Sequence, residues 1–195
     1  MNAIAKRLMQ LEKEIKEFKL EDLAKSELFV TAVLHASTVA LRTHQEEKLR
    51  ALQNAIINVA RGIDIEENLQ LLFLNAVDDL TTLHLKILKY FDDPRKWLEG
   101  HGKSFRTVIY LHETGRSKTP LHVSWGLENA FGELQHAIYD PIVTDLYNRG
   151  LINIDKTSLH AEIDPTDLLS SRTTRLGRQF LKYIGEWRPG IQGST

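Results

Sequence analysis

Apolar residues recur every three or four positions along the first 93 residues, which is the spacing of one face of an α-helix. The first such stripe lies among lysines and glutamates and comprises Ile4, Leu8, Leu11, Ile15 and Phe18. It predicts a helix with one narrow apolar edge that packs on its own bundle, the alternative being self-association through Leu8, Leu11 and Ile15. The run Leu28–Leu41 is apolar on most sides and predicts a buried, central helix.

Three more helices are predicted between residues 43 and 93. Thr43 and Glu46 fit a capping box, in which each side chain satisfies a free backbone donor at the start of a helix. Gly62 is placed to end that helix, and Pro94 can open a short further turn. The sequence therefore predicts an N-terminal helical bundle over residues 1–99.

Residues 100–125 have no sustained period and predict an irregular connector or insertion. The pattern then predicts a helix over 127–137, a helix beginning at Asp140, strands at 151–154 and 159–163 around a hairpin turn, and a last helix capped by Thr174. This order is typical of a winged-helix-like domain, here over residues 126–187, followed by a flexible tail at 188–195. The predicted fold is mainly α: an N-terminal helical bundle followed by a small α+β winged-helix-like domain.

Composition excludes several classes of protein. The net charge of -1 provides no global field to attract nucleic acid or an anionic membrane. The chain has no cysteine, which excludes disulfides and thiol catalysis and suits the reducing cytoplasm, where we expect the protein to reside. The longest apolar run, Leu28–Leu41, is shorter than the roughly 20 residues that a transmembrane helix needs, so none is predicted.

The sequence offers little catalytic chemistry. No two of the eight histidines lie three or four residues apart, so no helix presents an adjacent pair to a metal. Nucleophile-elbow, phosphate-loop and dinucleotide-binding motifs are absent from the sequence. We therefore predict no catalytic residue, metal or cofactor. An enzyme would require His101, His112, Trp97 and Trp125 to converge in one cleft.

The helix that a winged-helix protein would insert into DNA is predicted here to bind protein instead. Residues 122–165 hold seven acidic residues against two basic ones, and carboxylates near phosphates oppose binding. The candidate partner-binding residues on this helix are Asp140, Thr144, Asp145, Asn148 and Arg149.

Two basic regions provide the alternative. Residues 94–120 hold six basic residues against two acidic ones, and the closing helix carries further cations at helical spacing. The candidate phosphate-contacting residues are Arg106, Arg116, Lys118, Arg175, Arg178 and Lys182. For the last three we prefer ion pairs with acidic residues of 122–165, so nucleic-acid binding is disfavoured.

Four blocks, 44–60, 67–94, 145–152 and 171–184, resemble a group of uncharacterised bacterial proteins similar to the abortive-infection alpha proteins. The resemblance covers about residues 1–185 as a pattern and implies a helical bundle with a winged-helix-like end, an association with phage defence, and an apolar segment upstream in longer forms. It provides no catalytic residue. The leading hypothesis is a non-enzymatic module that binds a protein partner or another copy of itself, and the alternative is a DNA-binding regulator.

Overall fold

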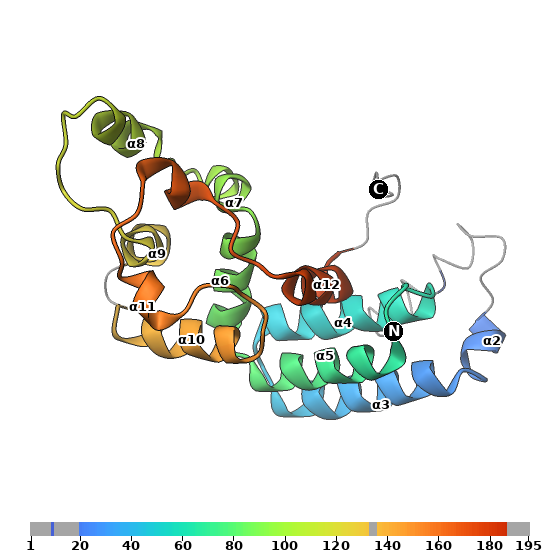
Figure 1. Ribbon diagram of the computed structural model, residues 1–195. Helices are drawn as coiled ribbons and strands as arrows, with labels where there is room; N and C mark the ends of the chain where they lie inside the picture. The colour runs from blue at the N-terminus through green and yellow to red at the C-terminus, as the bar shows by residue number, and fades with distance from the viewer. Residues whose placement is uncertain (1–8, 10–19, 133–135, 187–195) are drawn as a thin grey trace. The chain divides into compact units, whose positions relative to one another are not determined.

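A computed structural model describes residue 9 and residues 20–132 and 136–186, which are mainly helical (Figure 1). The chain divides into two compact units. Unit 1 contains the described residues up to Thr82 and those from Gln179 onward, and unit 2 is Leu83–Arg178. The predicted bundle ends at residue 99. In the structure the chain passes from unit 1 to unit 2 after residue 82 and returns to unit 1 inside the last helix.

Unit 1 consists of α2 (Leu20–Leu23), α3 (Glu27–Arg42), α4 (Glu46–Ala60), α5 (Glu67–Asp79) and the second half of α12 (Arg175–Ile184). Helices α3, α4 and α5 contact one another and lie side by side (Figure 1). The predicted capping box at Thr43 is wrong. Thr43 ends α3 in an extended conformation, and α4 begins after Gln45 without a side-chain cap.

An aromatic cluster fills the core of unit 1. Phe73 on α5 lies with its ring centroid 5.4 Å from that of Phe180 and 5.6 Å from that of Tyr183, both on α12. Asn58 on α4 donates from its side-chain amide to carbonyls near the end of α12, at 2.8 Å from Tyr183 O and 3.1 Å from Gly185 O. These bonds satisfy carbonyls that a helix end leaves without partners.

Helix α3 is not the buried helix that its composition predicts. It buries Ala32, Ala36 and Val39, whereas Leu34 is 64% exposed and Leu41 is 90% exposed. The small buried side chains let α3 approach its neighbours on one side only. Its other side faces solvent because no described element covers it. The predicted self-association residues Leu8, Leu11 and Ile15 lie outside the described residues.

Unit 2 contains α6 (Thr82–Asp92) from its second residue onward. It continues with α7 (Pro94–Gly100), α8 (Arg106–Glu113), α9 (Val123–Phe131), α10 (His136–Asn148), α11 (Lys156–Leu159), the 3-10 helix η2 (Pro165–Leu169) and the first half of α12. Two expectations are corrected here. Helix α8 lies within the segment 100–125 that was predicted to be irregular. Helix α10 does not begin at Asp140, since it contains Pro141 in its interior.

The predicted β-hairpin is also wrong. Residues 156–159 form α11, because the Asp155 carboxylate caps a helical turn by accepting from Ser158 N at 2.7 Å. Ile152 pairs in an isolated antiparallel bridge with Thr173, and Glu162 pairs with His122. Within its described residues the structure therefore contains two isolated β-bridges and no β-strand. The prediction that Thr174 caps the last helix is confirmed, since its Oγ1 accepts from Gly177 N at 3.0 Å.

Candidate functional site

A shallow hollow of about 400 Å³ lies along α10 in unit 2. Its lining residues are Asp140, Pro141, Thr144, Asp145, Asn148 and Lys156. All but Lys156 stand on α10 at successive intervals of one and three residues, which brings them to one side of that helix. Lys156 comes from α11, which contacts α10 (Figure 1). We call this surface the α10 hollow.

Asp140 at one end of the α10 hollow is held by two groups from the α11 region. Its carboxylate lies 2.7 Å from His160 Nε2 and 3.3 Å from Lys156 Nζ. Burial raises the pKa of Asp140, but the hydrogen bonds and charges of His160 and Lys156 together lower it by more, so the pKa lies below its usual value. Asp140 is therefore ionised and paired at neutral pH.

Asp145 lies farther along α10 and is paired in the same manner. Arg149 Nε lies 3.0 Å from Asp145 Oδ2, and His84 Nε2 on α6 lies 3.4 Å from the same oxygen. Each aspartate of the hollow thus has one basic side chain and one histidine beside it. The hollow is polar, with balanced charge, and Asp140 and Asp145 do not form the uncompensated negative face that the sequence predicts.

Two large apolar side chains are exposed on the same helix. Ile138 and Tyr147 are each 45% exposed. By helical geometry, Tyr147 falls beside Asp140 and Thr144, and Ile138 falls beside Asp145 on the opposite edge of the α10 hollow. The surface therefore combines hydrogen-bonding groups with two apolar side chains at its margins.

His84 gives the site a pH dependence that can be measured. Burial lowers the pKa of His84, and the nearby Asp145 carboxylate raises it by less. The unfolded chain therefore takes up a proton near pH 6.5 before the folded protein does, and stability falls as the pH drops below about 6.5. We expect His84→Gln to weaken this acid destabilisation, whereas replacing the exposed His44 in the same way leaves it unchanged. Urea unfolding midpoints measured between about pH 5 and pH 8 test this. Equal dependence of the midpoint on pH for the wild type, the His84 variant and the His44 variant would contradict it.

The structure brings together four of the five predicted partner-binding residues. Asp140, Thr144, Asp145 and Asn148 line the α10 hollow, and Arg149 stands beside it through its pair with Asp145. The i,i+4 spacing of Asp145 and Arg149 is a sequence signal for that pair. His84, Lys156 and His160 were missed, because nothing in the sequence shows which distant segments meet α10.

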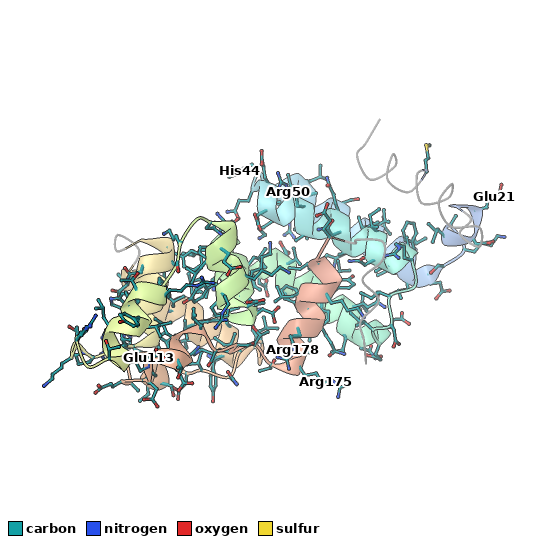
Figure 2. All side chains as sticks on the ribbon, turned by 90° about the horizontal axis from the view of Figure 1, so that it is seen from above. Glu21, His44, Arg50, Glu113, Arg175 and Arg178 are labelled. Carbon is teal, nitrogen blue, oxygen red and sulfur yellow. The ribbon has the colours of Figure 1, made fainter. Side chains whose placement is uncertain are left out.

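The cations of α12 do not pair as predicted. Arg175, Arg178 and Lys182 are exposed on this helix, and Figure 2 labels the first two. Among the described residues, none of the three forms an ion pair with an acid of 122–165. Arg178 Nη1 donates instead to Thr173 O at 2.6 Å. Burial raises the pKa of Asp92, and Arg178 opposes that shift. The three cations stand at helical spacing, so they form one basic stripe, here called the α12 stripe.

The other predicted phosphate-contacting residues lie around α8. Arg106 lines a pocket of about 210 Å³ that also contains Arg95, Lys103, Glu99 and Glu113. Arg116 places its guanidinium 5.6 Å from the Tyr110 ring centroid, and Lys118 is exposed. Because acidic side chains share the pocket, this region offers phosphate a mixed environment.

The two histidines without an explanation from sequence have separate structural partners. His101 stacks on Trp97 with ring centroids 3.8 Å apart. His112 on α8 has Nδ1 2.8 Å from Val108 O and Nε2 2.8 Å from Thr119 O. Trp125 packs against Phe105 instead, with ring centroids 5.2 Å apart. These contacts give each ring a role in packing or in holding a local turn.

Within residues 20–132 and 136–186, no group of three or more histidine and carboxylate side chains is placed to hold a metal ion. In the same ranges, every helix is too short or too polar to cross a membrane. Comparisons of the chain with protein-family models, with curated proteins and with solved structures found no match. The function must therefore be argued from the site itself.

Proposed function

We propose that this protein is a non-enzymatic interaction module that binds a protein partner through the α10 hollow. The observation that carries the proposal is the chemistry of this surface: paired carboxylates, the polar side chains of Thr144 and Asn148, and the exposed Ile138 and Tyr147. Protein interfaces combine such aromatic or aliphatic side chains with a polar rim. As part of the same proposal, the module acts in bacterial defence against phage, which rests on the sequence resemblance alone.

The charge pairing favours a protein partner over DNA at this surface. Both basic side chains beside the aspartates, Lys156 and Arg149, already contact a carboxylate. A phosphate would have to displace those carboxylates, which reduces the gain from counterion release. A polypeptide can instead use its own amides and hydroxyls with Thr144 and Asn148, and cover Tyr147.

The test is affinity capture from a lysate of the organism that encodes the protein, followed by binding measurements with the purified captured protein. We expect Tyr147→Ala to raise the Kd about tenfold, because an exposed tyrosine at an interface typically contributes more than other side chains. Thr144→Arg, which fills the hollow, is expected to abolish capture. Tyr110→Ala is the matched control, since Tyr110 is 51% exposed on α8 in the same unit. Capture that is equal for all four proteins would contradict the proposal.

The α12 stripe supports a second candidate, a winged-helix DNA-binding regulator. Asn153 N donates to Arg172 O at 2.9 Å and Thr174 N donates to Leu151 O at 3.0 Å, so a short antiparallel pairing stands between α10 and α12. A helix, a short antiparallel pairing and a closing helix follow one another in the order expected of a winged-helix domain. Arg175, Arg178 and Lys182 are exposed, and none of them forms an ion pair within 4 Å among the described residues, although the charge of Arg178 acts on Asp92.

Fluorescence anisotropy with mixed-sequence duplex DNA separates the two candidates. The second candidate requires affinity that falls steeply with salt, and replacing Arg175, Arg178 and Lys182 by glutamine should reduce the slope of log K against log salt by about 3. Under the first candidate, salt-dependent binding is absent and the triple variant still captures the protein partner.

A further inference from the structure

Helix α3 carries an exposed apolar stripe in unit 1, far in the sequence from the α10 hollow. Val30 is 40% exposed, Leu34 is 64% exposed and Leu41 is 90% exposed. Intervals of four and seven residues bring these side chains to one side of the helix, over about 17 Å at 1.5 Å per residue. The opposite side buries Ala32, Ala36 and Val39. We use the name α3 stripe for Glu27, Val30, Leu34, Ser37 and Leu41.

The spacing within the α3 stripe is that of a helix-helix seam. Its members are separated by three, four, three and four residues, which is the alternation of the two apolar positions in a heptad repeat. A single exposed leucine needs no explanation, whereas three apolar side chains aligned on one helix indicate a surface for another helix.

We propose that two copies of this chain associate through the α3 stripe with their α3 helices antiparallel. In the register that sets Val30 opposite the second copy's Leu41, Leu34 falls opposite the second copy's Ser37. Each large exposed side chain then meets either its apolar counterpart or a small residue that leaves space for it. A two-fold interface requires this self-complementarity, because the same surface serves both copies.

The charges of α3 fit the same arrangement. Glu27 begins the stripe, and Arg42, just beyond its other end, already pairs with Asp78 of the same chain at 2.7 Å. His44 lies between α3 and α4 (Figure 2). Antiparallel packing sets the two Glu27 carboxylates at opposite ends of the interface, whereas parallel packing would set Glu27 beside its own counterpart. No lysine or arginine lies between Glu27 and Leu41, so the stripe does not suit nucleic acid or an anionic membrane. Because the net charge is -1, the electrostatic repulsion between two copies is small.

Sedimentation equilibrium of the full chain over a wide concentration range tests the association. We expect the mean mass to rise from monomer towards dimer, and Leu34→Glu to raise the dissociation constant at least about tenfold, because a two-fold interface loses the leucine twice. Leu72→Glu is the matched control, since Leu72 is 52% exposed on α5 in the same unit. A wild-type chain that stays monomeric, as it would if residues 1–19 of the same chain covered the stripe, overturns the proposal. Equal dissociation constants for Leu34→Glu and Leu72→Glu would also overturn it.

Cysteine cross-linking tests the register independently, even if the glutamate variant does not fold. The chain has no cysteine, so Ser37→Cys introduces a single thiol. In the proposed register the two Ser37 positions are about 4.5 Å apart along the helix axis, within the reach of a disulfide. Mild oxidation should convert Ser37→Cys to a covalent dimer and leave Ser158→Cys, with its exposed position in unit 2, largely monomeric. Equal yields would overturn the register. The proposal does not depend on the α10 hollow, so the Tyr147 variant should dimerise normally.

Discussion

Phe73→Ala is expected to lower the free energy of unfolding by about 3 to 5 kcal/mol. The Phe73 side chain is 1% exposed and packs with Phe180 and Tyr183, so its removal leaves a cavity bounded by aromatic rings from another helix. Rings in contact cannot collapse into such a space without losing their own packing, which is why the cost is expected to be large.

Urea unfolding followed by far-UV circular dichroism measures this loss. Leu72→Ala, one residue away on α5, is the control, because Leu72 is 52% exposed and its truncation should cost less than about 1 kcal/mol. If Phe73→Ala were as stable as Leu72→Ala, the aromatic cluster would not be the centre of unit 1.

Gly177→Ala is expected to destabilise the protein by about 3 kcal/mol, the upper end of the range for inserting atoms into a packed core. A Cβ at this position would meet the carbonyl oxygen of Leu151 well inside contact distance and lie 2.6 Å from Thr173 Cγ2. The carbonyl cannot easily withdraw, because it accepts the hydrogen bond from Thr174 N. The close approach joins α12 to the short pairing that precedes it.

The sign of this effect is diagnostic. Alanine is about 1 kcal/mol better than glycine in an ordinary helix interior, so an unobstructed position would gain stability. Gly100→Ala is the control, because a Cβ there meets nothing within 4 Å. In thermal unfolding, Gly177→Ala should therefore lower Tm, and Gly100→Ala should raise Tm or leave it unchanged. A stabilised Gly177→Ala protein would show that α12 does not approach Leu151 so closely.

The sequence by itself determined the mainly helical class, the amphipathic pattern of α12 and the cap at Thr174. The amphipathic pattern of α12 separates Phe180, Tyr183 and Ile184 from Arg178 and Lys182, and this contrast depends only on local spacing. The Thr174 cap follows from local chemistry too, because a hydroxyl can reach an amide three residues ahead. The prediction of a mainly helical protein is confirmed for the same reason.

Tertiary structure alone decided which segments meet. Leu151 and Ile152 are both buried, so they lack the alternation that would identify a strand's partner, and the pairing with residues 172–174 depends on the long connection between them. The exposed side of α3 likewise follows from how many neighbours pack on it, whereas its composition favours burial on every side.

The candidate site shows the same division. The residues on α10 were predictable, because one helix presents them together. Their charge balance was not, since Lys156 and His160 lie 16 and 20 residues from Asp140, and His84 lies 61 residues from Asp145. None of these spacings has a local meaning. Local spacing fixes what a helix can present, and contacts between distant segments fix which of those groups are neutralised, buried or left for a partner.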